Sequence, residues 1–178
     1  MDAVRRFGPE VSIDVMADAA EVSKPVLYSE FGDKTGLVDA MAVVLAGRVE
    51  QEVTERVLAA GTLDARSIIA AIVESVIDLI DHEPNIYAYI VRSFRMRDRG
   101  LLDNALVRVI HDRSALILGA MVNELGPDEL DILVDGVFSF VFGVIESWVA
   151  KRQPPKDQLV AMMNAAIGAA LAEVANRQ

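Results

Sequence analysis

The sequence predicts an all-α protein of about nine helices, in which a few short N-terminal helices precede a bundle of longer ones. Two observations carry this prediction. Apolar residues recur at three- and four-residue spacing along most of the chain, which is the period of an amphipathic helix. Glycine or proline stands at the points where one helix is expected to end and the next to begin; these points are 8–9, 32, 61, 84, 100, 126–127 and 153–155.

The composition excludes several classes of protein. A chain of 178 residues can hold one or two domains and a sizeable core. It contains no cysteine, so no disulfide framework, thiolate metal site or cysteine nucleophile is expected. The most apolar segment, Ile132 to Ala150, is interrupted by Asp135 and Glu146, and Met1 to Pro9 lacks the apolar stretch of a signal peptide. We therefore expect a soluble cytoplasmic protein with no membrane span.

The first helix is expected to be incomplete. Met1 to Phe7 is predicted to be its last part, with Val4 and Phe7 facing inward and Gly8-Pro9 ending it. Because an average helix runs for about three turns, we expect this helix to be truncated, either because Met1 is an internal start or because an N-terminal arm is missing.

Two short helices joined by a tight turn are predicted next. Ser12 is a good N-cap for the first, because its hydroxyl can accept an unpaired backbone N–H. One face of that helix is apolar, formed by Ile13, Met16, Ala17 and Ala20. Glu21 and Val22 form the turn, with Val22 as the apolar contact between the helices. The spacing is that of a helix-turn-helix.

The second of these helices is bounded at both ends. Ser23 is its expected cap, and Pro25 lies in its first turn, where a missing N–H costs nothing. Leu27 and Phe31 are expected to face inward, and Gly32 suits a left-handed C-terminal position. Asp33 then caps a long helix that begins at Lys34.

The pattern of this segment resembles the DNA-binding signature of the tetracycline-repressor (TetR) family of bacterial transcription regulators. The residues that match lie in one register across the first quarter of the chain: Ser12, Ile13, Met16, Ala17, Ala20, Val22, Ser23, Lys24, Pro25, Leu27, Tyr28, Phe31, Lys34 and Leu37. The resemblance implies a helix-turn-helix DNA-binding domain over 1–45 and a ligand-binding and dimerisation domain over 46–178. It also implies an effector inside the second domain and a homodimer formed by the last two helices.

Eight residues are expected to contact DNA. Ser23 and Lys24 suit base edges or phosphates, and Val26 suits a thymine methyl group. Tyr28 and Lys34 match phosphate-contacting positions of the family, and Thr35 lies near a helix N-terminus that favours anions. The full set is Ser12, Ser23, Lys24, Pro25, Val26, Tyr28, Lys34 and Thr35. The alternative is that Val26 and Tyr28 are ordinary core residues.

The negative charge of this segment argues against DNA binding. The whole chain carries a net charge of −10, and Met1 to Leu37 holds four basic residues against seven acidic ones, a net charge of −3. Phosphate contacts supply much of the affinity of a DNA-binding protein. The family often has glycine at the position of Glu21 and a basic residue or histidine at that of Glu30, and both acidic residues would weaken binding.

The remaining helices follow from periodicity. Lys34 to about Ala60 is predicted to be one long helix, and Leu63 to His82 is apolar on nearly all sides. Further helices are expected over Asn85 to Arg97 and Leu101 to Leu125.

The last two helices, Asp128 to Arg152 and Lys156 to Arg177, are apolar on more than one face. The final one has large residues on one side and, on another, a row of small ones: Ala161, Ala165, Gly168 and Ala172. Because one face covers the parent domain, the other is most simply covered by a second copy of the chain.

The sequence says less about an effector. An apolar pocket with few polar groups would suit a small hydrophobic or amphipathic molecule. The candidate lining residues are Tyr87, Ile90, Val91, Phe94, His111, Phe138, Phe142, Glu146 and Trp148, each of a kind that is more often ordinary core than a ligand contact; Asn104 is a further polar candidate. Arg92, Arg95, Arg97 and Arg99 form a basic cluster that is most simply a solvated or interdomain face, with anion binding as the alternative.

No catalytic or metal site is expected, and no cofactor. The only two histidines, His82 and His111, lie outside any catalytic or metal-binding motif. The hypothesis is therefore a repressor that binds a palindromic DNA operator and is released by a small apolar effector. The alternative is a dimeric helical sensor or interaction protein that has lost DNA binding.

Overall fold

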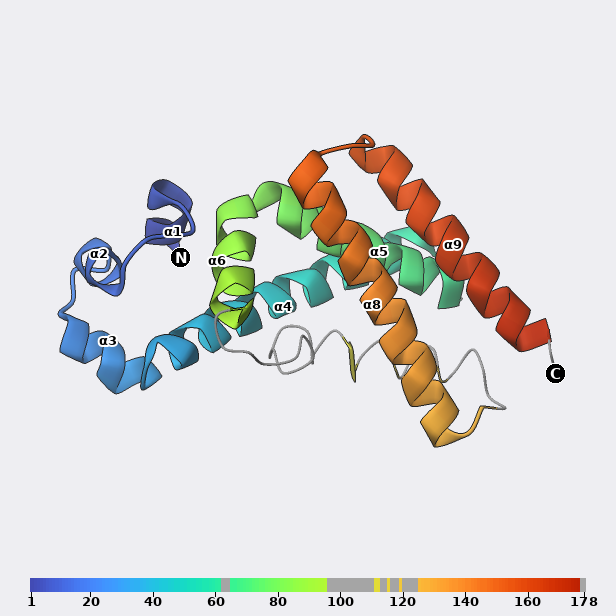
Figure 1. The fold of residues 1–178 in the computed structure, drawn as a ribbon, viewed down its shortest axis with the longest axis horizontal. Coiled ribbons are helices and arrows are strands. Elements are labelled where there is room, and N and C mark those ends of the chain that lie inside the picture. Colours follow the sequence, from blue (N-terminus) through green and yellow to red (C-terminus); the bar gives the residue numbers. More distant parts are fainter. Residues whose placement is uncertain (62–64, 96–110, 113–114, 116–118, 120–124, 177–178) are drawn as a thin grey trace. The chain divides into compact units, whose positions relative to one another are not determined.

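The computed structural model describes residues 1–61, 65–95, 111–112, 115, 119 and 125–176 (Figure 1). Within these residues the chain is helical and contains no strand. The helices are α1 (Asp2–Phe7), α2 (Ile13–Ala19), α3 (Lys24–Phe31), α4 (Lys34–Ala60), α5 (Ala65–His82), α6 (Pro84–Arg95), α8 (Pro127–Lys151) and α9 (Lys156–Asn176). This confirms the all-α prediction. The helix predicted from Leu101 to Leu125 lies largely outside the described residues.

The chain divides into two compact units. The first consists of Met1–Arg48 and Leu79–Arg108, and the second of Val49–Asp78 and Val109–Gln178. The long helices α4 and α5 each begin in one unit and end in the other. The functional division predicted at residue 45 stays a prediction.

In the first unit, α1 packs against α2 and α6, and α2 packs against α3. Apolar side chains from α1, α4 and α6 are almost completely buried there: Val4, Val38, Leu45, Ile86, Tyr89 and Ile90. The buried hydroxyl of Tyr89 donates to Sδ of Met16 at 3.9 Å, which joins α6 to α2. The helix-turn-helix is therefore held by its own hydrophobic core.

The prediction that Phe7 faces inward is wrong. Its side chain is 55% exposed, whereas Ala3 and Val4 are buried. Phe7 is the last residue of α1, and Gly8 follows it with a φ of 87°, so no further turn of helix covers the ring. The guanidinium of Arg6 instead lies 5.2 Å from the ring centroid.

In the second unit the buried apolar residues come from α4, α5, α8 and α9. Those of α9 are Leu159, Met163, Ile167 and Leu171, and those of α8 are Val134, Ile145 and Trp148. The row of small residues on α9 is separate from them: Ala161, Ala165 and Ala172 are exposed, as the sequence predicts for a second apolar face. Arg56 of α4 bonds to Glu74 of α5 at 2.9 Å and to Asp78, which in turn accepts from Lys156 at 2.6 Å.

Helix α8 is also the one described helix that is long and apolar enough to cross a membrane by length and composition. Core and interface helices of soluble proteins share this property. A single such helix is weak evidence for a membrane protein.

Candidate DNA-binding surface

The first helix and the turn of the helix-turn-helix are fixed by local backbone bonds. Ser12 accepts from the Val15 N–H at 3.3 Å, which confirms it as the cap of α2. After α2 the N–H of Val22 donates to Ala17 O at 3.0 Å, which closes a tight turn within the four residues, 20–23, that connect α2 to α3. Glu21 lies in this turn with a φ of 56°, a left-handed conformation that favours glycine. The glycine that the family often has at this position therefore matches the backbone of this chain.

Helix α3 begins and ends where the sequence predicts. Ser23 occupies its N-cap position and Pro25 lies in its first turn, but the side chain of Ser23 makes no capping hydrogen bond, contrary to the prediction. The missing donor of Pro25 removes one of the N–H groups that a cap would satisfy. Gly32 ends the helix with a φ of 78°.

The side chains of α3 are mostly exposed to solvent. None of its residues is fully buried, and only Leu27 and Phe31 are half-buried, as predicted for the inward face. Val26 is 50% exposed and Tyr28 is 38% exposed, so neither is a core residue. Because α3 exposes Val26 and Tyr28 to solvent, its outer side can contact another molecule.

Lys24 is paired within the protein. Its ammonium lies 2.9 Å from Asp14 Oδ1 and donates to Asp14 Oδ2 at 3.1 Å. The hydrogen bond and the charge of Asp14 raise the pKa of Lys24 above its ordinary value. The one cation of α3 is thus positioned beside an acidic residue of α2.

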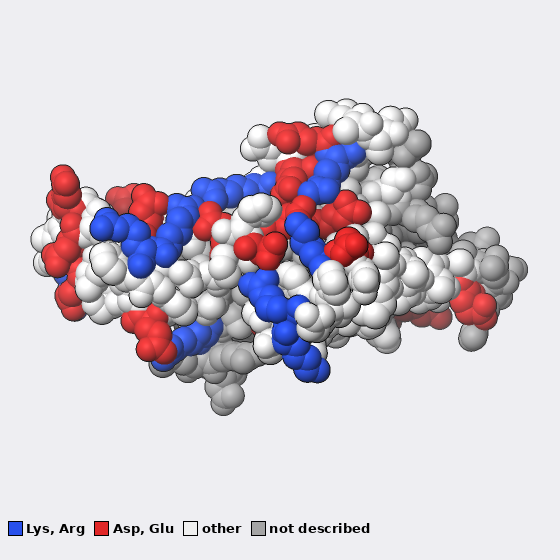
Figure 2. All heavy atoms as spheres, turned by 90° about the horizontal axis from the view of Figure 1, so that it is seen from above, with Lys and Arg blue, Asp and Glu red and all other residues white. Residues whose placement is uncertain are grey.

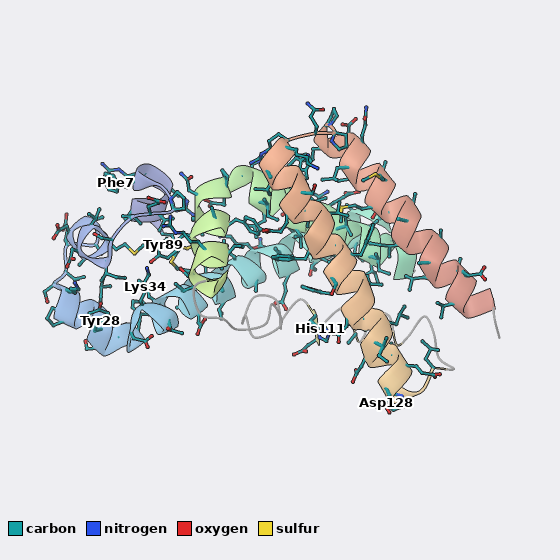
Figure 3. All side chains as sticks on the ribbon, viewed as in Figure 1. Phe7, Tyr28, Lys34, Tyr89, His111 and Asp128 are labelled. Atoms are coloured by element: carbon teal, nitrogen blue, oxygen red, sulfur yellow. The ribbon has the colours of Figure 1, made fainter. Side chains whose placement is uncertain are left out.

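The start of α4 lies beside α3. Asp33 caps α4 by accepting from the Gly36 N–H at 2.9 Å, which confirms the predicted cap. Lys34, the first residue of α4, places its ammonium 5.6 Å from the centroid of the Tyr89 ring of α6 (Figure 3). Thr35, which follows, is half-buried. Lys34 is therefore held at the edge of this surface by a cation–π contact.

A partly buried group of ion pairs, called here the junction, connects α1, α4 and the start of α6. Glu83, which directly precedes α6, accepts from Arg5 of α1 at 2.6 and 2.8 Å and from Arg48 of α4 at 2.9 Å. Asn85 donates to the backbone oxygen of Arg5 at 3.1 Å. The hydrogen bonds from Arg5 lower the pKa of Glu83, against the opposing effect of burial, and those to Glu83 raise the pKa of Arg5. Sequence reasoning missed this junction, because residues 78 positions apart carry no spacing signal.

The surface is electrostatically mixed. On the face drawn in Figure 2, Lys and Arg side chains lie among Asp and Glu side chains and do not form a continuous basic patch. Arg92, from the predicted basic cluster, pairs with Glu10. Arg97 and Arg99 lie outside the described residues, as do the side chain of Arg95 and the whole of Asn104.

The predicted effector-binding residues fall in both units and are described unit by unit. In the first unit Tyr87 and Ile90 are buried and Val91 is half-buried; Phe94 belongs to α6, but its side chain is outside the described set. In the second unit the half-buried residues are His111, Phe138, Phe142 and Glu146. Trp148 is buried, and its indole N–H donates to Pro154 O at 2.9 Å.

His111 is, with Glu146, one of the two polar members of the second-unit set that can form ionic contacts. Its Nε2 lies 3.0 Å from Asp135 Oδ1, and its ring meets that of Phe138 edge-on at 6.0 Å. In the described part of the chain, no group of three or more His, Asp or Glu residues is arranged to hold a metal ion. Among the described residues, His111 therefore has a carboxylate and an aromatic ring as neighbours, an environment suited to contacting a ligand.

Comparison with known proteins bears on the fold. No family model matches the sequence, and no curated protein matches it. Among solved structures, the chain is similar to the crystal structure of a TetR-family transcriptional regulator from Streptomyces coelicolor, with a TM-score of 0.67 and 20% sequence identity. The match covers 99% of this chain and 79% of that one. The chain therefore has the fold seen in a TetR-family transcriptional regulator.

Proposed function

We propose that this protein is a DNA-binding transcription regulator that binds a palindromic operator as a homodimer and is most simply a repressor. The observation that carries the proposal is the exposed helix α3, which follows α2 after a connection of four residues, 20–23, and leaves six of its eight residues open to solvent. A surface helix in this position enters the major groove in helix-turn-helix proteins.

The contacts to DNA are assigned from the placement of the predicted residues. Lys24 and Tyr28, four residues apart and exposed, share one side of α3 and are suited to phosphates. Lys34 and Thr35 lie at the start of α4 and Ser12 at the start of α2, where backbone N–H groups favour anions. Ser23, Pro25 and Val26 lie in the first turn of α3, closest to base edges.

The proposed dimer uses the outward faces of α8 and α9. These faces are exposed but poor in charge: α8 presents Ile132 and Phe140, and α9 presents Met162 beside its row of small residues. Exposed apolar surface of this kind marks an interface. A two-fold dimer would place two α3 helices about one duplex turn apart, which matches a palindrome.

An effector is proposed to bind among the half-buried side chains of the second unit. Phe138 and Phe142 of α8 supply apolar surface, while His111 and Glu146 supply the few polar groups that fix a ligand's orientation. Such a ligand would release DNA only to the extent that it binds one conformer more tightly than the other. A regulator of this kind works in the cytoplasm, without a cofactor and without catalysis.

A mobility-shift assay tests the proposal directly. The protein is titrated onto the palindromic DNA near its own gene and onto random duplex of the same length, at several salt concentrations. We expect a clear preference for the palindrome and a steep fall in affinity with salt. Equal binding to both duplexes contradicts the proposal.

A second function, a dimeric helical sensor that does not bind DNA, is favoured by one observation: Lys24 is already paired with Asp14 in a domain of net negative charge. It predicts that removing acidic side chains around α3 does not create DNA binding. Specific operator binding by the unmodified protein excludes it.

A further inference from the structure

We propose that α3 recognises A·T base pairs through the C5 methyl group of thymine, with Val26 as the main contact. This inference rests on the proposed function and goes further by naming the chemistry of the operator. It follows from the side chains that α3 presents to solvent and from the hydrogen bonds that two of them, Lys24 and Ser29, make within the protein.

The eight residues of α3 form four rows, because positions four apart lie on the same side of a helix. Leu27 and Phe31 form the half-buried row that faces the protein. Lys24 and Tyr28 form the row assigned above to phosphates. The two rows that remain for base edges are Pro25 with Ser29, and Val26 with Glu30; all four side chains are exposed.

These two rows offer no hydrogen-bond donor to a base; the hydroxyl of Ser23, which lies outside both rows at the N-cap position, can donate or accept. Pro25 and Val26 are apolar. Ser29 donates its hydroxyl proton to the backbone oxygen of Val26 at 2.8 Å, so its oxygen faces outward only as an acceptor. Glu30 carries a carboxylate, which also only accepts. The helix contains no Arg, Asn or Gln, and its one Lys, which could also contact guanine, is Lys24 of the phosphate row, paired with Asp14.

Guanine is the base that fits this face worst. In the major groove it presents two acceptors, N7 and O6, and a carboxylate beside them would be repelled. Glu30 can accept from the N6 amine of adenine or from the N4 amine of cytosine, but only an A·T pair also presents a methyl group to Val26, so an A·T pair fits best. Val26 would pack on the methyl group while Glu30, one turn further on, accepts from an amine.

The first stage of the test is selection of duplex DNA from a randomised library by the full-length protein. The second replaces each thymine of the enriched half-site, one at a time, by deoxyuridine. This change removes the C5 methyl group but keeps the base pair. Loss of one buried methyl group is expected to weaken binding about fourfold.

Two variants make the assignment specific. With Val26→Ala, the thymine whose replacement weakens wild-type binding about fourfold should show less than about a twofold effect. Val43→Ala is the matched control, since Val43 is an exposed valine of the same unit, 56% exposed against 50% for Val26. It should keep the wild-type pattern.

The outcomes separate the two claims. Enrichment of a half-site whose contacted pairs are G·C, or binding that no deoxyuridine replacement weakens, overturns the methyl readout and leaves the DNA-binding proposal standing. An effect of deoxyuridine that persists unchanged in Val26→Ala overturns the assignment to Val26. Failure to enrich any sequence overturns the proposed function and the inference with it.

Discussion

Lys24 of α3 is held by Asp14 of α2, with 2.9 Å between the ammonium nitrogen and the nearer carboxylate oxygen. Both side chains are exposed, so the pair contributes little to stability. Its importance is functional, because a phosphate contact by Lys24 must compete with Asp14. The free protein thus carries an acidic competitor next to its proposed DNA-binding helix.

The first prediction concerns this pair. Asp14→Asn frees the ammonium of Lys24 for a phosphate and should raise operator affinity at low salt. If one phosphate contact is gained, the slope of log K against log salt steepens by about 0.9. Fluorescence anisotropy over a salt series measures both quantities.

Asp18→Asn is the matched control, since it removes the same charge from another exposed position of α2. It should change affinity only slightly and leave the slope unchanged. Identical slopes for the two variants would mean that Lys24 gains no phosphate contact when it is released.

The second prediction concerns the turn. Glu21 has a φ of 56°, and a left-handed conformation costs a residue with a side chain about 1–2 kcal/mol. Glu21→Gly removes this strain, although glycine loses about 0.4–1 kcal/mol through its more flexible unfolded state. We therefore expect Glu21→Gly to be as stable as the wild type or more stable.

Glu21→Ala supplies the comparison, because it removes the charge but keeps the strain. Urea unfolding should show Glu21→Gly to be more stable than Glu21→Ala by about 0.5–1 kcal/mol. Equal stability of the two would show that the turn does not need the left-handed conformation in solution.

The third prediction is a pH dependence from Glu83. Its pKa is lowered, first by the hydrogen bonds from Arg5, below its ordinary value near 4.5. A carboxylate with a lowered pKa stabilises the fold above its unfolded-state pKa, and this stability is lost as the pH falls through the folded-state pKa. Unfolding measured between pH 7 and pH 3 should show a loss that begins below about pH 5.

Glu83→Gln should remove that part of the pH dependence and destabilise the protein at pH 7 by about 1–3 kcal/mol, since charged hydrogen bonds from two arginines are lost. Glu55→Gln, an exposed acid bonded to Gln51 alone in the described contacts, should cost less than about 0.5 kcal/mol. If Glu83→Gln retains the full wild-type pH dependence, the junction is not the source of the acid sensitivity.

The elements of the fold could be predicted because their signals are local. Ser12, Gly32 and Asp33 mark helix boundaries through hydrogen bonds that span three or four residues, and Pro25 marks one through its fixed φ and missing N–H. The inward row of α3 follows from the four-residue spacing of its apolar side chains. Helix α4 ends at Ala60, before Gly61, as the sequence predicts.

The pairings between helices could not be predicted in the same way. Arg5 meets Glu83 and Lys34 meets Tyr89 only because the chain folds back, and no spacing connects these residues. The partner of Lys24 was missed because it lies ten residues away, across the turn. Phe7 was misassigned because the inward spacing from Val4 holds only while a helix continues, and α1 ends at Phe7.

The last prediction concerns the proposed dimer. Ala165 is exposed on α9 within the row of small residues, where two helices from different subunits can approach closely. Ala165→Glu places a charge in that contact while changing helix propensity little, so it should separate the subunits without unfolding them. Sedimentation should then give the mass of one chain, 19.3 kDa, in place of twice that value.

The matched control is Leu58→Glu, which adds the same charge at an exposed position of the second unit outside the proposed dimer face. Leu58 is 73% exposed, as is Ile132 of α8, which belongs to that face. Leu58→Glu should leave the dimer intact. Because two linked α3 helices bind a palindrome more tightly than either alone, Ala165→Glu should lose about a hundredfold or more in operator affinity. A variant that stays dimeric, or that becomes monomeric and still binds the palindrome as tightly as the wild type, would show that α9 does not couple the two DNA-binding helices.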